Sequence, residues 1–330
     1  MAKIGMIGAG SWGTALTWLL TNNGHHVTMW SALGPEIEML KRDHEQKDKL
    51  PGVILSQDTV FTTQLSEAVE GMDLLVLAVP SPFTRSTSKQ LKGLVHDGQI
   101  IVNVAKGIEE DTLLTLSQII EEEIPQAEVA VLSGPSHAEE VGKGMPTAIV
   151  AGAYRKKTAE YIQNIFMSEV FRVYASPDVL GIELGAALKN VVALAAGIAD
   201  GLGCGDNTKA ALITRGIKEI SRLGMKMGGH FESFYGLSGI GDLIVTCASM
   251  HSRNRRAGIL IGKGYSMEEA MKEVKMVVEG VYSAKAAMGL ARRYDVPLPI
   301  IEQVNEVLFN GKPAVQAMND LMVRDKKIEI

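Results

Sequence analysis

Residues 3–13 read KIGMIGAGSWG, and this stretch decides the fold of the first part of the chain. An apolar run over residues 4–7 predicts a strand, and residues 12–21 carry apolar side chains at helical spacing. Between them, Gly8, Gly10 and Gly13 have the spacing G-x-G-x-x-G. In such a unit the glycines allow a tight turn, a close approach of backbone to a pyrophosphate, and close packing of helix on strand. The stretch therefore predicts a dinucleotide-binding fold.

The second predicted strand, residues 27–30, runs into Ser31-Ala32-Leu33. An acidic residue near this point would bind the ribose 2′-hydroxyl of NAD, and an arginine would suit the 2′-phosphate of NADP. The strand end and the Gly34-Pro35-Glu36 that follows are interpreted as lacking both, so the sequence leaves the choice between NAD and NADP open.

Alternating strands and helices continue beyond this unit. Near-continuous apolar runs, typical of parallel strands buried on both faces, predict further strands over residues 74–79, 100–104, 129–132, 148–150 and 170–174. The pattern changes at Ser176-Pro177-Asp178, a typical helix start. Helical periodicity then predicts helices over residues 178–201, 207–227, 252–262, 266–272, 280–294 and 299–309, while residues 243–245 are ambiguous. We expect an α/β domain over residues 1–177 and an all-helical domain over residues 178–330.

Composition narrows the class of protein. With 330 residues, 46% hydrophobic and 22% charged, the chain can bury sizeable cores, which excludes a disordered protein. Its formal net charge of −5 gives no general attraction to nucleic acid or to an anionic membrane. Two cysteines, Cys204 and Cys247, are too few for a disulfide scaffold and too far apart for a zinc motif, so we expect no metal site. With no apolar run of about 18 residues, a soluble cytoplasmic protein is expected.

Two loops after predicted strands carry polar side chains where α/β sheets bind ligands. Lys106 follows the strand at 100–104, and Ser136 lies in the turn Ser133-Gly134-Pro135-Ser136. Lys106 is interpreted either as a ligand contact or as a solvated loop charge. Ser136 is either a ligand contact or a helix N-cap, and His137 is interpreted as a loop histidine without a catalytic role.

Lys189 interrupts a helix that is otherwise apolar all round, AALKNVVALAA over residues 186–196. A buried ammonium is costly unless it is paired, and burial lowers a lysine pKa toward values that suit proton exchange. The alternative is a lysine whose ammonium reaches solvent from the helix edge.

Two further segments of the helical half suggest a site. Asp242 follows three closely spaced glycines, which would let backbone approach closely and hold the carboxylate in place. Ser252-Arg253-Asn254 opens a predicted helix and offers hydroxyl, guanidinium and amide groups to a phosphate. The alternative is an exposed basic face.

Taken together, six blocks resemble the soluble, bacterial-type NAD(P)-dependent glycerol-3-phosphate dehydrogenases. They occur in that family's order, at residues 8–15, 103–107, 133–136, 188–190, 239–243 and 252–256. The resemblance implies a Rossmann-type domain and a helical domain like that of 6-phosphogluconate dehydrogenase. It also implies reversible reduction of dihydroxyacetone phosphate to sn-glycerol 3-phosphate for phospholipid synthesis, with NAD or NADP as cofactor. The sequence leaves the oligomeric state open, with a homodimer as one expectation.

The resemblance also implies roles for single residues. Lys189 would be the catalytic acid/base, assisted by Lys106 and Asp242, with Asn190 and Thr246 as neighbours. The residues implied to bind substrate are Lys106, Gly134, Ser136, Lys189, Asp242, Ser252, Arg253 and Asn254. The residues expected to bind the cofactor are Gly8, Gly10, Ser11, Trp12, Gly13, Lys106, Ala138, Arg253, Val277 and Glu279.

One departure from the family and two alternatives remain. Family members that favour NADP usually carry a basic residue where this chain has Ser31-Ala32-Leu33. The alternatives are a dehydrogenase of a hydroxy acid or sugar acid on the same architecture, and a non-catalytic dinucleotide sensor.

Overall fold

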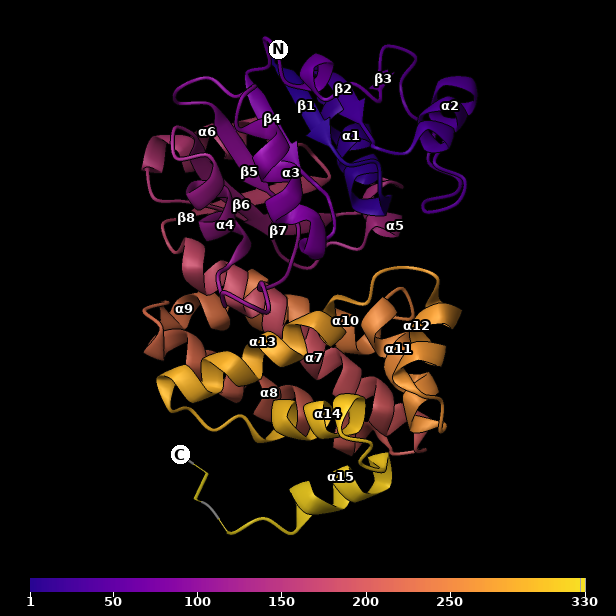
Figure 1. Ribbon diagram of the computed structural model, residues 1–330, viewed down its shortest axis with the longest axis vertical. Helices are drawn as coiled ribbons and strands as arrows, with labels where there is room; N and C mark the ends of the chain where they lie inside the picture. Colours follow the sequence, from indigo (N-terminus) through magenta and orange to yellow (C-terminus); the bar gives the residue numbers. More distant parts are fainter. Residues whose placement is uncertain (327, 330) are drawn as a thin grey trace. The chain divides into compact units, whose positions relative to one another are not determined.

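A computed structural model describes residues 1–326 and 328–329 and divides the chain into two compact units (Figure 1). Unit 1 comprises Met1–Lys106 and Leu114–Glu183, and unit 2 comprises Gly107–Leu113 and Leu184–Ile330. Each unit is described by itself.

Unit 1 contains an eight-stranded sheet in the order β3-β2-β1-β4-β5-β6-β7-β8. Its strands are β1 (Lys3–Ile7), β2 (His26–Trp30), β3 (Val60–Thr62), β4 (Leu74–Leu77), β5 (Ile100–Asn103), β6 (Glu128–Ser133), β7 (Thr147–Ala153) and β8 (Phe171–Ser176). The strand order reverses direction at β1, with β2 on one side and β4 on the other. Ligands of open α/β sheets bind at such a switch point, so the fold places the glycine loop after β1 where a dinucleotide site is expected.

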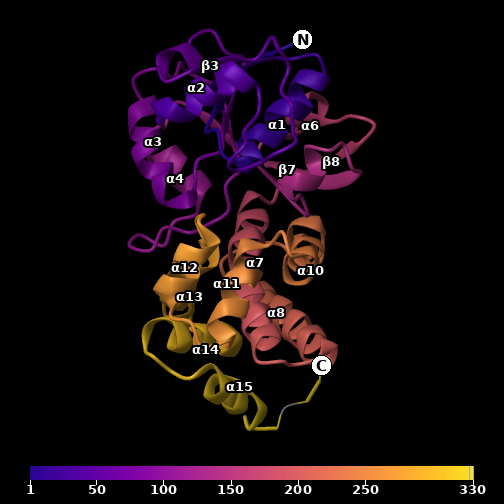
Figure 2. The ribbon, with the colours of Figure 1, turned by 90° about the vertical axis from the view of Figure 1, so that its right-hand side faces the viewer.

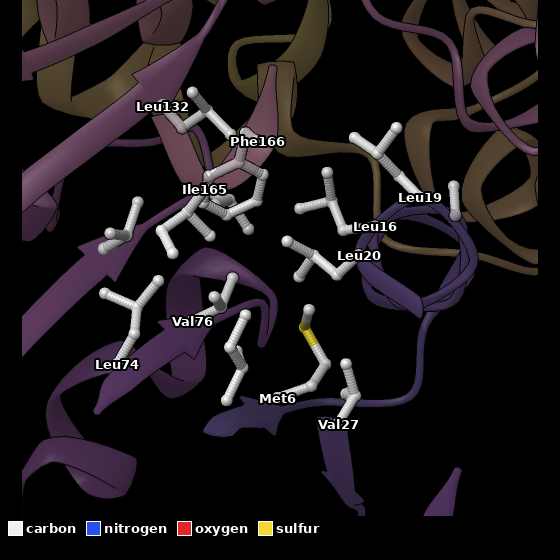
Figure 3. Close-up of a cluster of buried hydrophobic side chains, with 14 of the residues drawn as sticks. Met6, Leu16, Leu19, Leu20, Val27, Leu74, Val76, Leu132, Ile165 and Phe166 are labelled. Atoms are coloured by element: carbon white, nitrogen blue, oxygen red, sulfur yellow. The ribbon is translucent and has the colours of Figure 1, made fainter. Parts of the chain in front are cut away.

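Helices cover both faces of this sheet, which explains the continuous apolar strands. One face of the sheet packs against α1 (Ser11–Asn22) and α6 (Lys156–Phe166), and Figure 3 shows Leu16, Leu20 and Phe166 meeting the strand residues there. On the opposite face lie α3 (Thr84–Leu91) and α4 (Leu116–Glu123). In β4, Leu74 and Val76 join the first core cluster, whereas Leu75 and Leu77 join the second. The predicted α/β class with helices on both faces is confirmed.

Two features of the sheet were not predicted. The first is the short edge strand β3, which has no apolar run in the sequence, together with helix α2 (Gly34–Asp43), which precedes it. In addition, β7 is antiparallel to β6, although all other neighbours are parallel. The chain between β6 and β7 contains only the four-residue helix α5 (Ala138–Val141), which is too short to cross a face of the sheet as a parallel connection requires.

Unit 2 is built around the part of helix α7 (Val179–Gly201) that follows Glu183 (Figure 2). The other helices are α8 (Asp206–Lys226), α9 (Phe231–Phe234), α10 (Asp242–Ala248), α11 (Arg253–Gly262), α12 (Met267–Val274), α13 (Glu279–Tyr294), α14 (Pro299–Phe309) and α15 (Ala314–Met322). The all-helical class is therefore confirmed. The ambiguous residues 243–245 belong to α10, while α9 and α15 were not predicted because their apolar patterns are short.

Glycines bring α7 and α11 into backbone contact. A Cβ atom added to Gly258 would lie 2.3 Å from the carbonyl oxygen of Leu194, and one added to Gly201 would lie 2.3 Å from that of Ile259. Gly197 and Gly262 are equally tight, each with a partner oxygen 2.2–2.3 Å from the added Cβ. The two helices cannot separate their backbones without losing this contact, so the residues that α7 and α11 carry are held at a fixed spacing.

Helix α7 is long and apolar enough to cross a bilayer by length and composition alone. However, 94% of its most apolar window is buried within the structure. Its hydropathy therefore reflects a position in the core, where α8, α11 and α13 contact it. Elsewhere in the chain, Cys204 and Cys247 are both free thiols.

Glu219 on α8 should make stability depend on pH. Its buried carboxylate accepts hydrogen bonds from the backbone N–H groups of Ile300 and Ile301 at the start of α14, and burial raises its pKa from the ordinary 4.5 to about 7. The folded state thus holds this proton more tightly than the unfolded state. Its contribution to stability should fall as pH rises from about 4.5 to about 7, by about 3 kcal/mol.

Glu219→Gln mimics the protonated side chain and tests this expectation. Urea unfolding should show equal stability for variant and wild type at pH 5, with the variant more stable at pH 8. A difference that stays constant between the two pH values would contradict the raised pKa.

Candidate active site

The loop after β1 is shaped by its glycines. Gly8 has φ +124°, in the region that favours glycine, and a Cβ there would lie 2.8 Å from the backbone of Ala78. A Cβ on Gly13 would lie 2.2 Å from the carbonyl oxygen of Gly8, so helix α1 packs directly on the turn. Gly10, by contrast, has no heavy atom within 4 Å of an added Cβ. The loop is thus tight on its protein side and open at Gly10.

The start of α1 has the properties of an anion site. Gly10 is the N-cap and provides no side-chain hydrogen bond, and the first N–H groups of a helix have no intrahelical acceptor. The indole Nε1 of Trp12 is buried in the structure without a hydrogen-bond partner. An open glycine, helix N–H donors and an unsatisfied indole N–H together fit the pyrophosphate of a dinucleotide.

A carboxylate lies at the end of β2, where the sequence shows none directly after the strand. Glu36, in the first turn of α2, accepts hydrogen bonds from the hydroxyl of Ser31 at 2.5 Å and from Nε2 of Gln46 at 2.7 Å. It also forms an ion pair with Lys49. The prediction that no acidic group lies at this strand end is therefore wrong, because the turn into α2 brings Glu36, five residues beyond Ser31, back to that residue.

Lys106 and Ser136 meet at one backbone oxygen. Lys106 Nζ donates to the carbonyl of Gly134 at 3.1 Å, and the hydroxyl of Ser136 donates to the same oxygen at 3.0 Å. His137, rather than Ser136, is the N-cap of α5, so the helix-cap interpretation of Ser136 is wrong. The structure thus brings together Lys106, Gly134 and Ser136, three residues predicted to bind substrate. Ala138 is the first residue of α5.

A buried carboxylate, Glu183, supports the loop that carries Lys106. It accepts hydrogen bonds from Nδ2 of Asn103 at 3.1 Å and from the backbone N–H of Ser117 at 2.9 Å. Asn103 in turn bonds the backbone of Ala105 through both ends of its amide. Burial raises the pKa of Glu183, although the hydrogen bonds from Ser117 and Asn103 oppose that rise. Glu183 is not among the predicted site residues, yet a single acidic residue in the apolar run before Lys189 is a signal comparable to that of Lys189 itself.

In unit 2, Lys189 is buried and paired. Its side chain is 6% exposed and that of Asp242 is 2% exposed, and the two groups form an ion pair. Lys189 Nζ also donates to the hydroxyl of Thr246 at 2.7 Å, and this hydroxyl donates to the backbone carbonyl of Asp242 at 2.6 Å. The interpretation in which the ammonium reaches solvent is therefore wrong. The ammonium is instead fixed between an anion and an oriented hydroxyl.

Next to Lys189 on α7, Asn190 begins a second polar chain. Its Oδ1 accepts a hydrogen bond from Nδ2 of Asn254 at 2.9 Å, and Oδ1 of Asn254 accepts one from the N–H of Gly280 at 2.9 Å. Ser252 caps α11, accepting from the N–H of Arg255 at 3.1 Å. These bonds join α7, α11 and α13, so the Ser252-Arg253-Asn254 segment is a folded corner and not simply an exposed basic face.

The remaining predicted residues of unit 2 lie at helix starts. Arg253 is the first residue of α11, Glu279 is the first residue of α13, and Val277 lies two residues before it; all three are half-buried. The neighbouring Arg255 is engaged elsewhere, because its Nε donates to Asp200 at 2.7 Å. The role of Arg253 as an anion contact stays a prediction.

A doubly wound sheet with a glycine loop at its switch point, together with a helical unit holding a buried lysine–carboxylate pair, defines a class: the Rossmann-type dinucleotide-dependent oxidoreductases. Two family models match the chain, the NAD-dependent glycerol-3-phosphate dehydrogenase N-terminus over residues 3–159 and the corresponding C-terminus over residues 178–319. The chain belongs to this family.

Individual relatives agree with the family models. A protein of Agathobacter rectalis named glycerol-3-phosphate dehydrogenase [NAD(P)+] is 65% identical, with coverage of 100% of this chain and 98% of that protein. A Bacillus subtilis protein of the same name is 50% identical, with 100% and 96% covered. The crystal structure of glycerol-3-phosphate dehydrogenase from Coxiella burnetii is 33% identical with a TM-score of 0.95, covering 98% and 99%. These findings favour this family over the hydroxy-acid and sugar-acid alternative.

Proposed function

We propose that this protein catalyses the reversible, NAD(P)H-dependent reduction of dihydroxyacetone phosphate to sn-glycerol 3-phosphate. The observation that carries the proposal is the buried set of Lys189, Asp242 and Thr246 in a chain of this family. The carboxylate of Asp242 and the hydroxyl of Thr246 stabilise the Lys189 ammonium in place of solvent. The three residues come from two different helices, α7 and α10.

Lys189 would act on the oxygen of the substrate. In the reductive direction its ammonium donates a proton to the oxygen of the carbonyl group as that oxygen gains negative charge, and in the reverse direction the neutral amine accepts the proton from the hydroxyl. Asp242 balances the charge of the ammonium, and Thr246 fixes the direction of its N–H bonds. The bound nicotinamide supplies or accepts the hydride.

The remaining predicted residues receive roles within the same proposal. Gly8, Gly10, Ser11, Trp12 and Gly13 would hold the cofactor at the start of α1, with Lys106, Ala138, Arg253, Val277 and Glu279 as further contacts. The substrate phosphate and hydroxyls would bind Gly134, Ser136, Ser252, Arg253 and Asn254, with Lys106 beside the reacting group. Hydroxyl, amide and guanidinium donors at the start of α11 suit a phosphate dianion.

The proposed function is tested by following absorbance of the reduced nicotinamide while dihydroxyacetone phosphate is added, once with NADH and once with NADPH. Oxidation with either cofactor is the expected result. A protein that binds a reduced cofactor but oxidises it with neither this substrate nor any hydroxy-acid precursor would instead be a dinucleotide sensor. A homodimer working in the cytoplasm belongs to the same proposal, and light scattering on the purified protein tests the dimer.

A further inference from the structure

We propose that Glu36 makes this protein select NAD(H) over NADP(H), by accepting a hydrogen bond from the 2′-hydroxyl of the adenosine ribose and repelling a 2′-phosphate. The proposal rests on the proposed function only in that a dinucleotide binds to unit 1. It assigns a specificity-determining role to a residue that lies outside the strand end where sequence patterns place one.

The carboxylate of Glu36 is held in one orientation. Its Oε2 accepts from the hydroxyl of Ser31 at 2.5 Å, while Oε1 accepts from Gln46 at 2.7 Å and contacts the ammonium of Lys49. The Glu36 side chain is 9% exposed. Ser31 directly follows β2, the strand whose end contacts the adenosine ribose in Rossmann-type domains. Three donors therefore fix the carboxylate at the end of this strand.

Gln46 connects this carboxylate to the glycine loop. Its Nε2 donates to Oε1 of Glu36 and also to the backbone carbonyl of Ala9, at 2.8 Å. Ala9 lies between Gly8 and Gly10. Because this one nitrogen donates both to Glu36 and to Ala9, Glu36 lies beside the loop that would hold the pyrophosphate. A residue that contacts the neighbouring ribose must lie at such a position.

Hydrogen bonding and charge then discriminate between the two cofactors. An ionised carboxylate has about four acceptor positions, and the three bonds given above leave Oε2 with room for one more donor. A ribose 2′-hydroxyl can donate there. A 2′-phosphate monoester carries about −1.5 to −2 charges at neutral pH and would meet a fixed negative charge that is only partly exposed to water.

Lys49 is the cation that could reverse this preference, because it would attract a 2′-phosphate. Its ammonium is already paired with Glu36, and its side chain is 34% exposed. A phosphate would have to compete with Glu36 for that ammonium. In this arrangement Lys49 neutralises Glu36 and does not act as an independent phosphate site.

Binding of NADH and of NADPH, each titrated without substrate and followed by the fluorescence of the reduced nicotinamide, tests the proposal. Wild type should bind NADH at least tenfold more tightly than NADPH. Glu36→Gln keeps an oxygen for Ser31 but removes the charge and frees Lys49, so the ratio should shift at least tenfold toward NADPH. Glu38→Gln is the matched control, because Glu38 lies on the same helix, is exposed and pairs only loosely with Lys41 at 3.6 Å.

Three outcomes would overturn the proposal. An unchanged ratio in Glu36→Gln would show that the carboxylate does not contact the ribose. Tighter binding of NADPH by wild type, lost in Lys49→Met, would make Lys49 the determinant. Absence of binding of either cofactor by wild type would overturn the proposed function as well, which separates that failure from the other two.

Discussion

Replacing Lys189 with methionine should lower kcat for reduction of dihydroxyacetone phosphate by about 10²- to 10⁴-fold, the range that positioned acid/base catalysis contributes. Methionine keeps an unbranched side chain of similar length in the core of α7 but carries no proton to transfer. NADH binding should remain close to that of wild type, because the predicted cofactor loop lies in unit 1. Steady-state kinetics and cofactor titration on the same preparation measure both quantities.

The variant leaves Asp242 buried without its cation, which is itself destabilising. The double variant Lys189→Met/Asp242→Asn removes both charges and separates loss of the proton donor from loss of the fold. Lys209→Met serves as a control, since Lys209 also pairs with a carboxylate, Asp200, at 2.9 Å in the same unit. Turnover by the Lys189 variant within tenfold of wild type would refute the acid/base role.

Two alanine substitutions in the glycine loop should differ in how much stability they cost. Gly10→Ala adds a methyl group where no protein atom lies within 4 Å, at a backbone φ of −72° that alanine readily adopts. It should cost less than about 1 kcal/mol of stability, yet weaken NADH binding at least tenfold, because the pyrophosphate must approach the backbone at this position. Gly13→Ala places its Cβ 2.2 Å from the Gly8 oxygen and should cost about 1–3 kcal/mol, and weaken binding as well.

Thermal unfolding and cofactor titration of both variants check this contrast. Gly205→Ala is the matched reference for Gly10→Ala, because Gly205 is the N-cap of α8 at φ −85° and has no atom within 4 Å of an added Cβ. If Gly10→Ala bound NADH as tightly as wild type, the loop would not contact the pyrophosphate.

Much of the fold could be predicted because its physical signals are local. Strands buried on both faces read as unbroken apolar runs, and β4 and β5 began where those runs begin. The reversal of β7 could not be predicted in this way, since strand direction depends on the connection and leaves no mark on the strand itself. The three-residue β3 is held by pairing with β2, which is again a contact between distant residues.

The residues of the candidate site likewise divide into those with a local signal in the sequence and those placed by contacts between distant residues. Lys189 could be selected because a lone charge in an apolar helix requires a partner, but its partners Asp242 and Thr246 lie more than 50 residues away. Glu36 could not be selected, because its proximity to Ser31 depends on the turn into α2. A charged residue inside an apolar helix can be recognised in the sequence, whereas a charged residue that a turn brings to a strand end can be recognised only in the structure.

The backbone contact between α7 and α11 limits how this protein could acquire new substrates. Lys189 and Asn190 lie on one of these helices and Arg253 and Asn254 on the other, and the two backbones are already in contact at four glycines. The distance from the proposed proton donor to the proposed phosphate contact is thereby set by the main chain. Separating the helices to fit a substrate one carbon longer would break this backbone contact, so we expect divergence in substrate length to proceed through side-chain exchange or through loss of these glycines.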